Sequence, residues 1–121
     1  RQHPLAFMRD FLKKRGILSA KQVSKLNNGC IVHIAGLVLM RQRPGKGRVI
    51  FVTLEDETGM FNLLIWADLA ERQRKTLLGS SILGATAELQ IENGVQYLIC
   101  QHLEDHSDIL GKLDIKSYDF K

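Results

Sequence analysis

The sequence has little of the material from which disulfide scaffolds, metal clusters or membrane spans are built. Its 121 residues include two cysteines and two prolines, and Cys30 and Cys100 lie far apart with no C-x-x-C motif. This spacing excludes a disulfide framework and favours a reducing compartment. No apolar run approaches the length of a membrane span, and the polar, basic N-terminus lacks the apolar centre of a signal peptide. Membrane insertion and secretion are therefore unsupported.

Acidic residues are scarce in the first part of the chain. Residues 1–48 contain 11 bases and 1 acid, a balance of +10, whereas residues 49–121 contain 6 bases and 12 acids, a balance of −6. A basic region on an otherwise acidic domain is typical of a surface that attracts phosphates, because each neutralised phosphate releases counterions. An ordinary solvated basic face is the alternative, and the charge alone favours it. The chain also starts at Arg1 rather than Met, so we expect it to be part of a longer protein.

The apolar residues first follow a helical period. A length of 121 residues suits one domain with a single core, and an apolar share of 45% is ordinary for a folded protein. Apolar positions recur at helical spacing between Pro4 and Gly16, and a second helix is predicted to start at Ser19. The pattern predicts an N-terminal helical pair over residues 1–28.

From residue 30 onward the apolar period changes from 3.6 to two. Strands are predicted over residues 30–41, 49–54, 60–66, 82–91 and 95–103. A helix is predicted over residues 68–78, between the third and fourth strands. Gly36 in the first strand predicts a bulge or bend, and Asn93-Gly94 predicts a tight hairpin. This order is that of the five-stranded Greek-key barrel called the OB-fold, whereas a small SH3-like barrel lacks a helix of this length.

Alternation assigns the two sides of this all-β barrel, which we expect over residues 29–103, with an irregular tail over residues 104–121. The inward positions are Val32, Ile34, Val38, Ile50, Val52, Leu54, Phe61, Leu63 and Ile65. Their neighbours, His33 among them, face outward. For Trp66, alternation favours an outward position and side-chain size favours a covered one.

Four bases fall within eight residues at the end of the first predicted strand and in the turn after it: Arg41, Arg43, Lys46 and Arg48. In an OB barrel this turn lies at the edge of the surface that binds single-stranded nucleic acid. Phe51 beside a basic turn suits base stacking, because an aromatic face accepts any base. We therefore predict a nucleic-acid-binding site whose other members are Thr53, Asn62, Leu64, Gln96 and Tyr97. In the alternative interpretation, the N-terminal helices cover Phe51 and the arginines are ordinary loop charges.

Two clusters of titratable residues have a structural interpretation that outweighs a chemical one. Carboxylates such as those of residues 55–57 can hold a metal or act as an acid–base pair, but Asp56 more often fixes a turn by accepting backbone N–H bonds. His102 and His106 need a helix to converge on a metal, and no cysteine joins them. We therefore predict no catalytic residue, no metal and no cofactor.

Four stretches of the sequence resemble one known family. They are VHIAGLV at 32–38, RQRPGKG at 41–47, FVTLEDETG at 51–59 and NLLIW at 62–66. Together they resemble the C-terminal OB domain of the bacterial error-prone C-family DNA polymerases, relatives of the replicative polymerase III alpha subunit. The resemblance covers nearly the whole chain. The LEDETG segment alone is also shared with anticodon-binding domains of some tRNA synthetases, whereas its combination with RQRPG is more specific.

The resemblance implies a nonenzymatic module of a bacterial cytoplasmic polymerase whose two-metal active site lies upstream. We expect the barrel to hold single-stranded template DNA for translesion synthesis and repair, mainly through phosphate charge and base stacking. The expected partners are single-stranded DNA, the rest of the polymerase chain and replisome or translesion accessory proteins. Two alternatives remain open. One is a protein-interaction module that docks a polymerase partner or the sliding clamp, and the other is an RNA-binding domain of the anticodon type.

Overall fold

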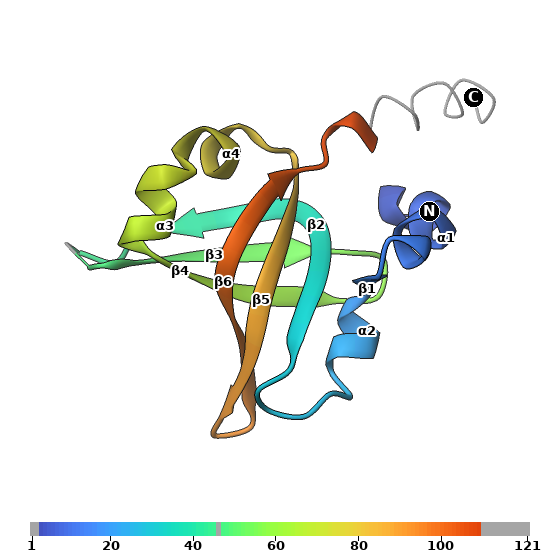
Figure 1. The fold of residues 1–121 in the computed structure, drawn as a ribbon, viewed down its shortest axis with the longest axis horizontal. Coiled ribbons are helices and arrows are strands. Elements are labelled where there is room, and N and C mark those ends of the chain that lie inside the picture. The colour runs from blue at the N-terminus through green and yellow to red at the C-terminus, as the bar shows by residue number, and fades with distance from the viewer. Residues whose placement is uncertain (1–2, 46, 110–121) are drawn as a thin grey trace.

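The computed structural model describes residues 3–45 and 47–109. These residues form a β-barrel with short helices at both ends (Figure 1). The strands are β1 (Ile17–Leu18), β2 (Ile31–Gln42), β3 (Val49–Glu55), β4 (Met60–Trp66), β5 (Ile82–Glu92) and β6 (Val95–Asp105). The helices are η1 (Pro4–Met8), α1 (Arg9–Lys14), α2 (Ala20–Val23), α3 (Ala67–Arg72) and α4 (Arg74–Gly79). Within the described ranges, no helix has both the length and the apolar character needed to cross a membrane.

Five of the strands close the barrel because β2 pairs with two partners. Its first part, residues 31–37, pairs antiparallel with β5, and its second part, residues 37–42, pairs antiparallel with β3. The ring is completed by antiparallel pairing of β3 with β4 and of β5 with β6, and by parallel pairing of β4 with β6. The short β1 adds to β2 as an extra strand. The predicted five-stranded OB fold is confirmed.

The predicted bend in β2 depends on Gly36. A Cβ atom at this position would lie 2.9 Å from the Cβ of Leu54 and 3.0 Å from the carbonyl oxygen of Glu55, so only glycine allows β3 to approach this closely. The irregularity in strand register lies farther along, between Val38 and Met40. The predicted Asn-Gly hairpin between β5 and β6 is also present, with φ of 53° at Asn93 and 78° at the following glycine.

The barrel interior follows the predicted alternation. Seven of the nine predicted core residues are buried, and Val38 and Ile50 are partly buried against the same cluster. Ala20 and Val23 of α2 belong to this cluster, so α2 closes one end of the barrel. A second cluster joins η1, α1 and β1 to the outside of the barrel. Its buried members are Leu5, Met8, Leu12, Ile17, Ala35, Ile82 and Ile109.

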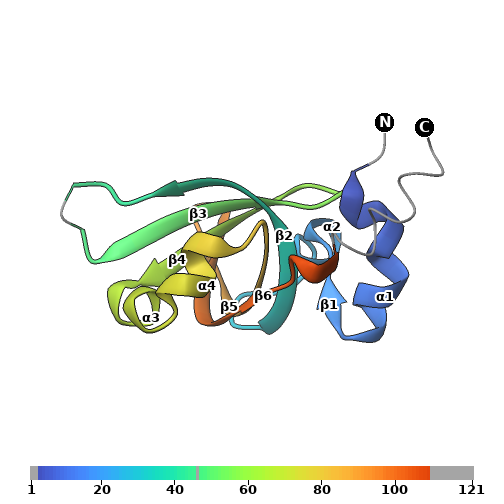
Figure 2. The same ribbon diagram turned by 90° about the horizontal axis from the view of Figure 1, so that it is seen from above.

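The single helix predicted over residues 68–78 is wrong, because the chain forms two short helices that break at Gln73. The Gln73 side chain bonds to the backbone of β6: its Nε2 donates to the carbonyl oxygen of Leu103 at 2.8 Å, and its Oε1 accepts from the Leu103 N–H at 2.7 Å. The β6 strand itself ends at Asp105, later than predicted, because it continues to pair with β5 as far as Leu83. From above, α1 lies at one end of the molecule and the β2–β3 turn projects at the other (Figure 2).

Candidate nucleic-acid interface

The outer surface of β3, β4 and β6 presents one continuous row of side chains. Phe51 of β3 lies opposite Leu64 of β4, which in turn lies opposite Ile99 of β6. Residues on either side of each of these are more deeply buried, so the three side chains share the face directed away from the core. Thr53 and Asn62 form the next pair along the same two strands. We call this surface the outer face.

A shallow cavity of about 240 Å³ lies on the outer face. Its lining residues are Phe51, Leu64, Gln90, Glu92, Tyr97 and Ile99. Phe51 is 37% exposed, and the described lining comes only from β3, β4, β5 and β6. The alternative in which the N-terminal helices cover Phe51 is therefore wrong. Two aromatic and two aliphatic side chains give the cavity an apolar floor, and Glu92 is the acid at its rim.

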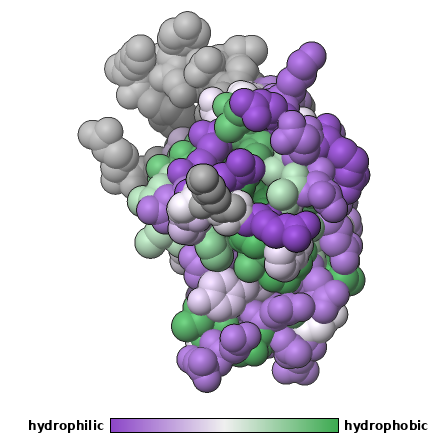
Figure 3. Space-filling model, turned by 90° about the vertical axis from the view of Figure 1, so that its left-hand side faces the viewer, coloured by the Kyte–Doolittle hydropathy of each residue, from purple (hydrophilic) through white to green (hydrophobic). Residues whose placement is uncertain are grey.

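The β2–β3 turn carries the exposed arginines. Arg43 and Arg48 are both exposed, and neither side chain forms a hydrogen bond or an ion pair with any residue that the structure describes. Lys46 lies outside the described residues. The Arg48 carbonyl oxygen accepts from the Ala67 N–H at 2.8 Å, which fixes the end of the turn beside α3. From this end of the molecule, hydrophobic side chains are interspersed among hydrophilic ones (Figure 3).

Arg41, predicted as a binding residue, is exposed, but its guanidinium bonds to backbone atoms of this chain. Its Nε donates to the carbonyl oxygen of Leu77 at 2.8 Å, and its Nη2 donates to the carbonyl oxygen of Ser80 at 3.1 Å. These carbonyls lie at the C-terminal end of α4, where a cation is favourable because helix carbonyls there lack intrahelical partners. The structure thus gives Arg41 a role in holding α4 against β2.

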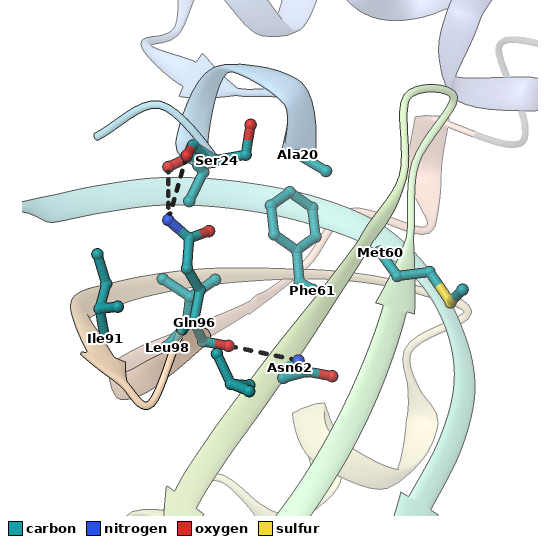
Figure 4. Close-up of a pocket in the computed structure, with 11 residues that line it drawn as sticks. Ala20, Ser24, Met60, Phe61, Asn62, Ile91, Gln96 and Leu98 are labelled. Carbon is teal, nitrogen blue, oxygen red and sulfur yellow. Dashed lines mark hydrogen bonds between the residues drawn. The ribbon is translucent and has the colours of Figure 1, made fainter. Parts of the chain in front are cut away.

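Gln96 and Tyr97 point to different sides of β6. Tyr97 lines the cavity beside Phe51, whereas the Gln96 side chain turns toward α2 (Figure 4). Its Nε2 lies 3.3 Å from the carbonyl oxygen of Val23 and 3.4 Å from that of Ser24. Gln96 therefore tethers the β5–β6 hairpin to α2 and lines a separate groove of about 580 Å³.

Asn62 lies at the boundary between the two hollows. Its Nδ2 donates to the backbone oxygen of Gln96 at 3.3 Å, and the side chain also lines the groove beside α2 (Figure 4). Thr53, its neighbour on β3, is partly exposed on the outer face. The structure therefore brings Phe51, Leu64 and Tyr97 together and leaves the other predicted site residues around them.

The carboxylates of residues 55–57 stabilise the β3–β4 turn. Asp56 is only 2% exposed, and its Oδ1 accepts from the N–H groups of Thr58 at 2.7 Å and Gly59 at 3.0 Å. Its Oδ2 accepts from the N–H of Ala20, the first residue of α2, at 2.8 Å. The prediction that Asp56 fixes this turn is confirmed.

Glu57 forms an ion pair with Arg9. Arg9 donates to its two carboxylate oxygens at 2.6 and 2.8 Å, and the Arg9 Nη2 also lies 3.3 Å from Asp56 Oδ2. The hydrogen bond from Arg9 lowers the pKa of Glu57, and the same hydrogen bond raises the pKa of Arg9. Together, Asp56 and Glu57 fasten α1 and α2 to the barrel.

The sequence interpretation did not include Ile99 or Gln90 in the site, and it did not decide whether Trp66 faces outward or is covered. Alternation along β6 identifies Ile99, because its neighbours Leu98 and Cys100 are buried. Burial raises the pKa of the Cys100 thiol to about 12, which suits a packing role rather than reactivity. Trp66 is 52% exposed, so alternation rather than side-chain size decides its position.

The fold and the outer face together define the class of this protein. The family model for the OB-fold nucleic acid binding domain matches residues 32–105, and the chain belongs to this family. An error-prone DNA polymerase from Alkalilimnicola ehrlichii is 46% identical over 120 residues, which cover 98% of this chain and 12% of the relative. An error-prone DNA polymerase from Pseudomonas syringae pv. tomato is 47% identical over the same shares. The resemblance to error-prone polymerases is confirmed, and the chain spans about an eighth of the length of these relatives.

Two solved structures have a similar fold. Asparaginyl-tRNA synthetase from Pyrococcus horikoshii matches with a TM-score of 0.62 and 19% identity, over 73% of this chain and 22% of that one. OBody AM1L10 bound to hen egg-white lysozyme matches with a TM-score of 0.54 and 14% identity, over 65% of this chain and 80% of that one. At these identities the likeness shows the fold alone.

Proposed function

We propose that this chain is a module that binds single-stranded DNA for an error-prone DNA polymerase. The observation that carries the proposal is the exposed Phe51 in an apolar cavity, together with Arg43 and Arg48, whose side chains bond to no residue within 3–45 and 47–109. The relatives are named as error-prone DNA polymerases, and from that name we infer a role in translesion synthesis and repair. In this role the chain carries no chemistry of its own and positions template for a catalytic site elsewhere in the polymerase.

Binding on the outer face combines two forces. Bases stack on the rings of Phe51 and Tyr97, at about 1–3 kcal/mol for each base. Arg43 and Arg48 neutralise phosphates, and the released counterions make the affinity depend on salt. Because the floor of the cavity is apolar, base stacking dominates over hydrogen-bond readout and the sequence preference is small.

Fluorescence anisotropy with a labelled oligothymidine over a salt series tests this proposal. Phe51→Ala is expected to weaken binding roughly 5- to 100-fold through lost stacking. The double variant Arg43→Glu/Arg48→Glu is expected to lower both the affinity and the salt slope, by about 1.4 for two phosphate contacts. The control is Lys13→Glu/Lys14→Glu, which makes the same charge change on exposed residues of α1 at the opposite end of the molecule.

The control variant distinguishes binding at a specific site from general electrostatic attraction. Equal losses for the two double variants, with Phe51→Ala binding like the wild type, would contradict binding at the outer face. Tighter binding of oligouridine than oligothymidine would favour an RNA ligand of the anticodon type. Oligonucleotides that fail to bind the wild type at low salt would overturn the proposal altogether.

A protein-docking function is the second candidate. It is favoured by the groove of about 580 Å³ between α2, β4 and the β5–β6 hairpin, whose edge carries the well-exposed Met60. The OBody of similar fold is bound to lysozyme, so this architecture can hold a protein. Stable capture of a sliding clamp, a polymerase segment or an accessory protein by the wild type, abolished by Met60→Arg, would favour this function over DNA binding.

A further inference from the structure

Trp66 is an aromatic side chain that the outer cavity does not include. It is the chain's single tryptophan, it ends β4 and it immediately precedes α3. Half of its surface is exposed, although tryptophan carries one of the largest apolar surfaces of any residue. It lines a small hollow of about 110 Å³ with Arg48, Ala67 and Asp68.

Strand register places Trp66 on the same outer face as Phe51. Phe51 lies directly opposite Leu64, and Trp66 lies two residues beyond Leu64 on the same side of β4. Trp66 is thus a diagonal neighbour of Phe51. Such neighbours are about 7–8 Å apart, a distance within reach of aromatic side chains. The two aromatic residues therefore occupy diagonal positions on one surface.

Arg48 lies beside the second platform. Val49 pairs with Trp66, and the Arg48 carbonyl oxygen accepts from the Ala67 N–H at 2.8 Å, so the two strands hold Arg48 and Trp66 together. The Arg48 side chain has no hydrogen-bond or ion-pair partner within residues 3–45 and 47–109. Asp68 also lines the hollow and repels phosphate, which favours a nucleic-acid backbone that passes close to Arg48.

We propose that Trp66 is a second stacking platform, on which a base of a single-stranded nucleic acid stacks while Arg48 contacts the adjoining phosphate. The inference rests on the proposed function and extends it, because it adds a site at the end of β4 and defines the path of the bound nucleic acid. The nucleic acid runs from the Phe51–Tyr97 cavity across Leu64 to Trp66 and the β2–β3 turn. Neighbouring bases are then separated from one another and stacked on protein side chains.

The single tryptophan makes a label-free test possible. Oligothymidine titrated into the wild-type chain is expected to quench Trp66 fluorescence saturably, with the same midpoint as the anisotropy titration. Trp66→Ala is expected to weaken binding roughly 5- to 100-fold, whereas Trp66→Phe, which keeps an aromatic face, retains most of the affinity. Leu78→Ala is the control, since it shortens an apolar side chain of similar exposure, 54%, that lines neither hollow.

The outcomes separate this inference from the proposed function. Anisotropy that reports binding without fluorescence quenching, together with wild-type affinity for Trp66→Ala, would overturn the second platform and leave the first intact. Equal weakening by Trp66→Ala and Leu78→Ala would also overturn it. If the wild type binds no oligonucleotide, both the inference and the proposed function fail. Circular dichroism of each variant shows whether the barrel is retained, and the wild-type quenching experiment needs no variant.

Discussion

The two turns that flank β3 use charged residues in opposite ways. At the β3–β4 turn, Asp56 and Glu57 have their bonding capacity taken up by Arg9 and by backbone N–H groups. At the β2–β3 turn, the side chains of Arg43 and Arg48 bond to no residue in the described part of the chain. One strand therefore joins a turn that stabilises the fold to a turn whose charge is available to a ligand.

This difference shows that the bonding partner of a charged side chain indicates its role better than its position in the sequence does. The balance of +10 in residues 1–48 includes Arg9 and Arg41. Arg9 pairs with the β3–β4 turn, which we call the acidic turn, and Arg41 binds the end of α4. The charge of Arg9 is neutralised by Glu57, and two donor atoms of Arg41 are already bonded to carbonyl oxygens, so neither side chain is fully available to a phosphate. The exposed arginines of one turn therefore carry more of the argument for a nucleic-acid ligand than the overall charge does.

The largest expected effect comes from breaking the acidic turn. Asp56→Ala leaves the buried N–H group of Ala20 and the N–H groups of Thr58 and Gly59, whose bonds are partly buried, without their acceptor; an unsatisfied buried group costs about 1–3 kcal/mol. We expect the free energy of unfolding in urea to fall by about 3 kcal/mol or more. Glu55→Ala is the matched control, because that side chain is 39% exposed and we expect its loss to cost less than about 1 kcal/mol. Equal effects of the two substitutions would contradict the role of Asp56.

A smaller effect is expected at Arg41, and it sharpens the division between structural and ligand-binding arginines. Arg41→Gln removes two charge-assisted bonds to carbonyls of α4 and should lower the free energy of unfolding by about 1–3 kcal/mol. The affinity for oligothymidine should stay close to the wild-type value. Arg43→Gln should show the reverse pattern, with weaker binding and unchanged stability. If Arg41→Gln weakens binding without changing stability, the assignment of this arginine is wrong.

The smallest expected effect is a pH dependence at Glu57. Its folded pKa lies below the ordinary value of 4.5, so its pairing stabilises the fold fully above that value. The stabilisation, about 1 kcal/mol for a partly buried pair, is lost as the pH falls through the folded pKa. The urea midpoint of the wild type should therefore exceed that of Glu57→Gln at pH 7, and the difference should shrink as the pH falls below 4.5. A constant difference across this range would show that Glu57 does not titrate with unfolding.

Much of the fold was predictable because periodicity is local. Alternation in β3 and β4 identified the core, and the Asn-Gly dipeptide identified the hairpin at Asn93. The helix break at Gln73 was not predictable, because it depends on bonds to Leu103, which only the folded barrel brings near. The same holds for Arg41, whose partners lie in α4, far along the chain.

The side of a strand on which a candidate residue lies was predicted correctly where alternation was applied, and incorrectly where it was not. Phe51 and Leu64 lie on the outer face as alternation requires. Gln96 and Tyr97 were both assigned to the predicted site, although adjacent residues of a strand point to opposite sides. Alternation also identifies Trp66 as outward, and only its size argued against that position.

A chemical-shift map most directly tests whether the ligand contacts the β2–β3 turn and leaves the β3–β4 turn unaffected. Unlabelled oligothymidine would be titrated into the isotopically labelled 121-residue chain, and backbone amide shifts would be followed residue by residue. We predict that the largest changes fall on the β2–β3 turn and on Phe51, Leu64 and Tyr97, while Asp56 and its neighbours in the acidic turn change little. Changes concentrated on α1, α2 and the acidic turn, with the β2–β3 turn unaffected, would contradict this account.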